Sequence, residues 1–231
     1  MGPLLAALRY ELGDGHTYDY AEGTASCPID PGLATYFLTN DDCFAYFDPS
    51  RPESFATALH HLAEFIEHEG PFDGIMAFSQ GAQMAAALLA RLQAHRPTGY
   101  PVRCAIFLSA ATPDGAPILG PPTDEVEVPL QLPTAHIWGE TDYSATSRML
   151  STMSRPEWCF PFVHSGGHEV PGGSSRRYGY ARPRTAGFIA ARGQAVRGDT
   201  SGLGGPKDKL HQGVVCQQTQ RGTSPQIVRL P

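Results

Sequence analysis

The sequence predicts an α/β fold in which helices flank a mostly parallel β-sheet. Short apolar runs of strand length alternate along the chain with amphipathic segments of helix length. Such alternation is typical of parallel strands that are joined by right-handed helical crossovers. The chain has 231 residues, of which 41% are hydrophobic, so it is long and apolar enough to bury the core of one such domain.

The chain starts with a helical pattern and not with a strand. Leucines recur at helical spacing over residues 1–12, and Gly13 follows as a residue type that commonly ends a helix. We expect a strand over 17–20 and an irregular loop over 21–40, where Gly, Pro, Asp and Thr are frequent. Loops of this length in compact domains are more often functional than idle, so this loop is a candidate wall of a substrate pocket.

A second helix is expected after residue 50. Residues 50–53 (Ser-Arg-Pro-Glu) have the form of a capping box, and apolar side chains follow on one face until Gly70 and Pro71. The polar face holds side chains that could be interpreted as metal ligands: His60, His61, Glu64, Glu67, His68 and Glu69. We interpret them as a solvated helix face instead, and the sequence predicts no metal site.

Residues 71–92 have the pattern of a buried strand, a tight turn and a helix. Residues 73–78 form a short apolar run of strand length, and small apolar side chains of 80–92 lie on one helical stripe. Ser79 stands between the two elements. A serine at this point has two interpretations: it is the nucleophile of a strand-to-helix turn, or it merely caps the helix.

The neighbours of Ser79 favour the nucleophile. Ala77 lies two residues before it and Gly81 two residues after, which is the spacing of the nucleophile elbow G-x-S-x-G with alanine in place of the first glycine. Small residues are needed there because the strand and the helix approach closely at a strained turn. The backbone N–H of Gln80, at the start of the helix, is a candidate donor to a developing oxyanion.

Three further strands are expected downstream. They cover residues 102–110, 134–138 and 158–163, with a proline-rich, acidic loop over 112–133 and a helix over 144–153. In open α/β sheets, catalytic and ligand-binding groups lie beyond the carboxyl ends of the strands. Polar residues that directly follow these strands are therefore the first candidates for a site.

Asp142 and His168 each follow such a strand, as Ser79 does. The three residues occur in the order Ser, Asp, His, which is the order of α/β-hydrolases. We expect His168 to take the proton of Ser79 and return it to the leaving group. We expect Asp142 to hold the imidazole in the required tautomer and to stabilise the imidazolium.

Two alternatives to this assignment stay open. Glu140 is an alternative acid, although it lies nearer to the end of its strand than Asp142 does. His164 is an alternative base, but it lies at the end of the expected strand, and we interpret it as a structural residue. His136 lies within a strand and is interpreted in the same way.

Three segments resemble the fungal serine-hydrolase family of α/β-hydrolases, which includes lovastatin-type thioesterases that release polyketides from their synthases. They are residues 71–82 (PFDGIMAFSQGA), 139–142 (GETD) and 166–171 (GGHEVP). The FSQG core alone also resembles acyl-protein thioesterases and carboxylesterases. The resemblance covers residues 1–171 and implies hydrolysis of esters or thioesters through an acyl-enzyme. It also implies an acyl substrate that is a small molecule or is bound to a carrier, with a polyketide synthase as a candidate partner.

The start of the chain departs from that family. Its members usually begin with a strand that ends in a His-Gly-rich turn, and this turn carries the second oxyanion N–H. The sequence contains no such segment before its first helix. We therefore expect an α/β-hydrolase-like sheet that lacks its first strand, with unpaired strand edges and a weak or unstable enzyme.

Charge divides the chain sharply. Residues 1–170 hold 21 Asp and Glu against 7 Lys and Arg, whereas residues 171–231 hold 2 against 10. We therefore expect a serine-hydrolase domain over 1–171, a divergent helical segment over 172–192 and a disordered basic tail over 193–231. The tail lacks apolar periodicity, so we expect it to be dispensable.

Composition narrows the remaining possibilities. The five cysteines include no C-x-x-C pair, which favours a reducing compartment, and neither a signal peptide nor an apolar run of membrane-spanning length occurs. We expect a cytoplasmic protein that binds neither membrane nor nucleic acid and needs no cofactor, because no nucleotide, phosphate or metal motif is present. The alternative function is a non-catalytic or weakly active α/β-hydrolase remnant that acts as a binding protein.

Overall fold

The structure is a computed structural model, and it describes most of the chain up to residue 171. The described residues are 15–28, 43–95, 101–112, 118–119, 129–142 and 145–171, with Tyr10, Leu12 and the backbone of two C-terminal strands. Most of the helix expected over 1–12, most of the loops expected over 21–40 and 112–133, and the segment 172–192 lie outside the described residues.

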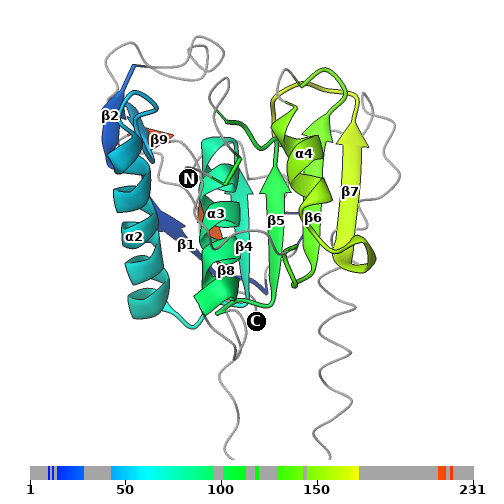
Figure 1. The fold of residues 1–231 in the computed structure, drawn as a ribbon. Coiled ribbons are helices and arrows are strands. Elements are labelled where there is room, and N and C mark those ends of the chain that lie inside the picture. Colours follow the sequence, from blue (N-terminus) through cyan, green and yellow to red (C-terminus); the bar gives the residue numbers. More distant parts are fainter. Residues whose placement is uncertain are drawn as a thin grey trace, which may run out of the picture.

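One parallel sheet of six strands runs through the middle of the molecule (Figure 1). Its order is β1-β8-β4-β5-β6-β7, and every neighbouring pair is parallel. The strands are β1 (Tyr18–Ala21), β4 (Gly74–Phe78), β5 (Cys104–Leu108), β6 (Thr134–Gly139), β7 (Cys159–His164) and β8 (Gly213–Cys216). The predicted fold class is confirmed, and the carboxyl ends of the strands meet at one edge of the sheet.

Helices cover the sheet because its central strands are apolar on both faces. Every residue of β4 and of β5 is buried, as is typical of parallel strands enclosed between layers. The helices are α2 (Pro52–Glu69), α3 (Gln80–His95) and α4 (Thr146–Thr152), with the 3₁₀ helix η2 (Pro156–Trp158) before β7. A large apolar cluster joins α2 and α3 to the sheet, and a smaller cluster is built around Met76, Phe78, Ile106, Leu108, Ala135, Ile137 and Val170.

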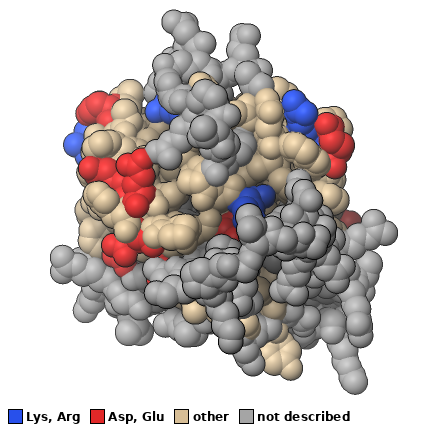
Figure 2. All heavy atoms as spheres, turned by 90° about the horizontal axis from the view of Figure 1, so that it is seen from below, with Lys and Arg blue, Asp and Glu red and all other residues tan. Residues whose placement is uncertain are grey.

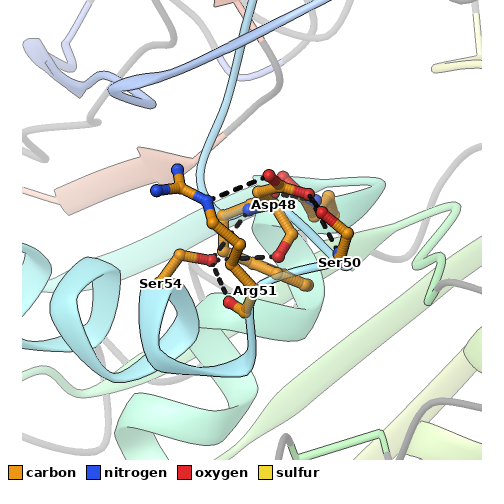
Figure 3. Close-up of polar contacts among 6 residues, drawn as sticks. Asp48, Ser50, Arg51 and Ser54 are labelled. Atoms are coloured by element: carbon orange, nitrogen blue, oxygen red, sulfur yellow. Dashed lines mark hydrogen bonds and ion pairs between the residues drawn. The ribbon is translucent and has the colours of Figure 1, made fainter.

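The turn before α2 differs from the predicted capping box (Figure 3). Asp48 organises it: its carboxylate accepts hydrogen bonds from the backbone N–H of Ser50 at 2.9 Å, the Ser50 hydroxyl at 2.7 Å and the Arg51 Nε at 3.1 Å. Hydrogen bonds from Ser50 thereby lower the pKa of Asp48 below its ordinary value. The Ser54 hydroxyl accepts from the Asp48 N–H at 2.9 Å and donates to the Arg51 carbonyl at 2.6 Å. The prediction for Ser50 is wrong because its side chain bonds to the preceding aspartate and not to the helix.

Strand β8 corrects two predictions at once. Residues 193–231 are expected to be a disordered tail, but Gly213–Cys216 lies between β1 and β4 in the centre of the sheet. Ile75, Met76 and Ala77 of β4 pair with Val214, Val215 and Cys216. The sheet therefore has no unpaired gap beside β4, contrary to the expectation of unpaired strand edges, because a strand from the C-terminal part of the chain lies there. Backbone groups of a buried parallel strand require partners on both sides, and a four-residue strand is too short to be recognised by periodicity.

A second, antiparallel sheet joins two strands that precede α2 to one strand from the C-terminal part of the chain. Its strands are β2 (Ala25–Cys27), β3 (Cys43–Ala45) and β9 (Thr219–Gln220), in that order. Strand β2 lies in the stretch that the sequence predicts to be irregular, and β9 lies in the predicted tail. Figure 1 shows β2 and β9 beside the end of α2 that faces the carboxyl ends of the strands. This small sheet therefore borders the edge at which a site is expected.

The polar face of α2 is exposed to solvent, as expected. His60, His61, Glu64, Glu67, His68 and Glu69 are all exposed, and His60 Nε2 lies 3.4 Å from Glu64 Oε1. Figure 2 shows acidic side chains gathered on the side of the molecule where α2 lies. Among the described residues, no group of three His, Cys, Asp or Glu side chains could hold a metal ion. None of the described helices is both long and apolar enough to cross a membrane.

Candidate active site

Ser79 occupies the turn between β4 and α3 with a left-handed backbone. Its φ is 55°, which is uncommon for a residue with a side chain and is typical of a strained functional turn. The neighbouring strand holds this turn in place, because the Ser79 N–H donates to the Leu108 carbonyl at 3.0 Å and the Ser79 carbonyl accepts from the Ala111 N–H at 3.2 Å. Ala77 and Ala82 on either side are fully buried, so the turn has no room for larger side chains.

The structure brings Ser79, His168 and Asp142 together in one hydrogen-bonded chain. His168 Nε2 lies 3.0 Å from Ser79 Oγ, and His168 Nδ1 lies 3.0 Å from Asp142 Oδ1. The Asp142 side chain is 1% exposed and the His168 side chain 12%. The imidazole also lies against the Phe78 ring, with centroids 5.2 Å apart. The hydroxyl therefore bonds to the imidazole, whereas helix capping would direct it to a backbone N–H of α3.

Direct contacts between their two loops align Asp142 and His168. The Thr141 N–H and hydroxyl both donate to the Gly166 carbonyl, at 3.1 and 3.0 Å. Gly139 packs against the same loop so closely that a Cβ there would overlap the carbonyl oxygens of Gly166 and Gly167. The aspartate loop and the histidine loop thus form one unit.

Ser109 ties this unit to β5. It follows the strand with φ 40° and is completely buried, and its hydroxyl donates to the Glu169 carbonyl at 3.2 Å, one residue beyond His168. Neither Ser109 nor Thr141 is identified as a site residue from the sequence. The position of Ser109 at a strand end was the available signal, because it repeats the placement of Ser79 on the neighbouring strand.

The start of α3 presents backbone N–H groups beside Ser79. The Ser79 carbonyl accepts the first helical bonds, from Ala82 at 3.0 Å and Gln83 at 3.4 Å. The N–H of Gln80 precedes these donors and has no acceptor within the helix. This N–H lies directly after Ser79 in the chain, at the end of the helix that favours negative charge.

Comparison with known proteins identifies the family. A family model described as "Serine hydrolase (FSH1)" matches residues 5–178, about three quarters of the chain. This chain belongs to the FSH1 serine hydrolase family. It is 34% identical to Esterase FPY3 of Fusarium mangiferae over 72% of this chain and 79% of that protein. It is 33% identical to Esterase OVCA2 of Bos taurus over 62% of each chain, and 30% identical to Hydrolase phiM of a fungal species over 67% of this chain and 71% of that protein.

The alternative site residues of this FSH1 serine hydrolase lie differently. The Glu140 side chain is exposed, and its backbone N–H donates to the His164 carbonyl at 2.7 Å. His164 is 7% exposed, and its Nδ1 accepts a hydrogen bond from the Gly166 N–H at 3.2 Å. Burial lowers the pKa of His164, although Glu169, Asp142 and Glu140 act in the opposite direction. Neither residue is hydrogen-bonded to Ser79 or His168, in contrast to Asp142.

His136 is enclosed in the core of the FSH1 serine hydrolase. It is 0% exposed, and its Nε2 lies 3.1 Å from Thr134 Oγ1 and 3.2 Å from Ser154 Oγ. Burial lowers its pKa to about 3, so the side chain is neutral at physiological pH. Its position agrees with its interpretation as a structural residue.

Proposed function

We propose that Ser79, His168 and Asp142 form the catalytic triad of an esterase that acts through an acyl-enzyme. The observation that carries the proposal is the continuous chain of two 3.0 Å contacts from Asp142 to His168 to Ser79. Each residue comes from the carboxyl end of a different strand, so the arrangement depends on the whole sheet. Catalytic triads are recognised by this geometry, a serine hydroxyl bonded to an imidazole that is bonded to a carboxylate, and not by the sequence positions of their members.

The proposed reaction begins with proton transfer from Ser79 Oγ to His168 Nε2 as Oγ attacks the carbonyl carbon of the substrate. The Gln80 N–H donates to the oxyanion of the tetrahedral intermediate. His168 then returns the proton to the leaving alcohol or thiol, and the acyl group stays on Ser79. A water molecule then attacks the acyl-enzyme and gives a proton to His168. The second tetrahedral intermediate collapses, the acid is released, and His168 returns the proton to Ser79 Oγ.

The substrate class that we propose is an acyl ester or thioester, either a small molecule or an acyl group bound to a carrier such as a polyketide synthase. Support comes from the esterase and hydrolase names of the fungal relatives and from the resemblance of residues 166–171 to polyketide-releasing thioesterases. Esters and thioesters share the same attack by serine and differ only in the leaving atom. One site can therefore serve both.

The test combines a covalent probe with turnover. Wild type should be labelled by a fluorophosphonate at Ser79, located by peptide mass spectrometry, and should hydrolyse p-nitrophenyl butyrate and a butyryl thioester. Ser79→Ala should abolish both, whereas Ser151→Ala should leave both unchanged, because the Ser151 hydroxyl bonds within α4. An unlabelled wild type without turnover would overturn the esterase and favour the binding-protein alternative.

The carrier-bound part of the proposal needs its own measurement. An acyl group loaded on an acyl-carrier protein should be released in a Ser79-dependent manner, at a kcat/KM above that of the same acyl group on a short thiol. If the short thioester is cleaved and the carrier-bound acyl group is not, the carrier is not the substrate and the esterase assignment still stands.

A further inference from the structure

The side chain of Gln80 links the nucleophile turn to a distant segment of the chain. Its Oε1 accepts a hydrogen bond from the Tyr46 N–H at 2.8 Å, and its Nε2 donates to the Phe47 carbonyl at 3.2 Å. Both ends of the carboxamide are thus used on two consecutive backbone units. These bonds are separate from the backbone N–H of Gln80, which is the proposed oxyanion donor.

The segment that Gln80 holds, residues 43–47, is also fixed on either side of this contact. The Tyr46 hydroxyl donates to the Ala21 carbonyl at the end of β1, at 2.8 Å, and both groups are buried. After residue 47 the chain enters the turn in which Asp48 and Ser54 bond to one another (Figure 3). The two bonds of the Gln80 side chain tie this segment to the first residue of α3, next to Ser79.

The strand order places this segment on the side of Ser79 away from the histidine. His168 and Asp142 follow β7 and β6, which lie on the β5 side of β4, whereas Ala21 ends β1 on the other side. Figure 1 shows α2 and β2 at one side of the molecule and β6, β7 and α4 at the other. A substrate bound at Ser79 therefore has His168 on one side and residues 43–47 on the other.

We propose that residues 43–47 form the wall of the substrate site opposite His168 and that the Gln80 side chain is the positioning residue that fixes this wall relative to Ser79. The wall limits the length of the acyl group, so Gln80 determines acyl selectivity. This inference depends on the esterase function proposed above. Tyr46 and Phe47 anchor the segment in the hydrophobic core, and Phe44 is half-buried, so its ring keeps exposed apolar surface that suits a hydrocarbon chain.

The same helix provides a matched control. Gln93 Nε2 donates to the Pro129 carbonyl at 3.1 Å, and Gln93 Oε1 accepts from the Gln131 N–H at 2.9 Å. This is the same pair of bonds to a loop, 13 residues further along α3 and therefore about 20 Å away. The same two bonds can therefore be removed next to Ser79, at Gln80, and far from Ser79, at Gln93, and the effects on activity can be compared.

The experiment compares Gln80→Met, Gln93→Met and Tyr46→Phe with wild type on p-nitrophenyl esters from acetate to decanoate. Methionine keeps the length of the side chain and removes both bonds. We expect both methionine variants to lower Tm by a similar few degrees. Gln80→Met and Tyr46→Phe should change the ratio of kcat/KM between decanoate and acetate at least fivefold, mainly through KM, and Gln93→Met should not change it.

The outcomes separate this inference from the proposed function. If Gln80→Met lowers kcat equally for every ester and Tyr46→Phe has no effect, the Gln80 side chain supports only the turn of Ser79, and the wall is wrong. If wild type shows no Ser79-dependent turnover, the esterase is wrong, and hydrogen exchange decides the positioning role. Gln80→Met, unlike Gln93→Met, should accelerate exchange over 43–47 at least tenfold. Equal exchange in the two variants would overturn the role of Gln80.

Discussion

At the scale of single residues, burial and partners separate three histidines that the sequence cannot rank by type. His168 contacts Ser79 and Asp142, and His164 accepts a backbone hydrogen bond. His136 is buried in the core, where its Nε2 contacts the hydroxyl groups of Thr134 and Ser154. Only the first has both ring nitrogens engaged in a way that suits proton transfer. Burial lowers the pKa of both other histidines, and that of His136 falls to about 3, so His136 is neutral in the folded chain at physiological pH.

His136 makes stability depend on pH. Its pKa is lowered to about 3 in the folded chain from an ordinary 6.5, so only the unfolded chain binds this proton between those values. The contribution of neutral His136 to the free energy of unfolding is complete above pH 6.5 and is lost as the pH falls toward 3. From pH 7.5 to pH 5 the loss is about 2 kcal/mol, at about 1.4 kcal/mol per pKa unit.

Urea unfolding of wild type and His136→Gln across this range checks the prediction. The free energy of unfolding of the variant should be lower overall but should fall less steeply toward pH 5 by about 2 kcal/mol. If the free energies of unfolding of wild type and His136→Gln change with pH in parallel, folding does not lower the pKa of His136, and the prediction is wrong.

Asp142 should matter through the tautomer of His168. In Asp142→Asn the amide can present a donor to Nδ1, so the proton moves to Nε2 and the base for Ser79 is lost. We expect kcat to fall by about 10⁴ with Tm nearly unchanged. Glu140→Gln should stay within a few-fold of wild type, because that side chain is exposed. A larger loss in Glu140→Gln than in Asp142→Asn would reverse the assignment of the acid.

At the scale of elements, the two loops after β6 and β7 act as one part. Thr141 donates twice to the Gly166 carbonyl, and Gly139 leaves no space between the loops. The loops carry the aspartate and the histidine, so their mutual packing sets the distance between those side chains. The contact is a property of two sequence segments that are about 25 residues apart.

Gly139→Ala should disrupt this contact. A Cβ at residue 139 would overlap the carbonyl oxygens of Gly166 and Gly167, and backbone atoms cannot turn aside as a side chain can. We expect the His168 loop to shift and kcat/KM to fall at least a hundredfold. The rate of fluorophosphonate labelling should fall in parallel.

Gly167→Ala is the matched control. A Cβ there would meet Thr141 Oγ1 at 3.5 Å and the Thr141 carbonyl oxygen at 3.9 Å, and both are ordinary van der Waals contacts. This variant should keep activity within a few-fold of wild type. If the two alanine variants lose the same activity, the loop is sensitive to any added side chain, and the specific overlap at Gly139 is not the cause.

At the scale of the whole molecule, the centre of the sheet is completed by the far end of the sequence. Strand β8 shares four residue pairs with β1 and three with β4. Strand β4 leads directly into Ser79, so the position of the nucleophile depends on a segment more than 130 residues downstream. Each buried backbone group left without a partner costs about 1–3 kcal/mol, against a total stability of about 5–15 kcal/mol.

Removal of residues 207–231 should therefore destabilise the domain strongly. We expect a loss of cooperative thermal unfolding, or a Tm lowered by more than 10 °C, with loss of phosphonate labelling at Ser79. Removal of 221–231 alone, which leaves β8 and β9 in place, should have little effect. If both truncated chains melt like wild type, β8 does not contribute to the stability of the sheet, and the tail is dispensable as its composition predicts.

The sequence by itself determines the features that depend on local pattern. Periodicity and turn residues locate β4, β5, β6, β7 and the three helices, and the spacing around Ser79 identifies the elbow, because these signals involve residues within about ten positions of each other. The order of Ser79, Asp142 and His168 then follows from their places after successive strands. Their family resemblance also needs no tertiary information.

Only the tertiary structure decides the features that depend on distant segments. Three contacts join segments that are more than 30 residues apart. They are the pairing of β8 with β4, the hydrogen bond from Ser109 to the histidine loop, and the hydrogen bonds between Gln80 and residues 43–47. Strands of two to four residues carry no readable period, and a hydrogen bond from a side chain to a remote carbonyl leaves no pattern in the sequence. Backbone groups take whichever partner the folded chain brings to them, and that partner is known only once the chain has folded.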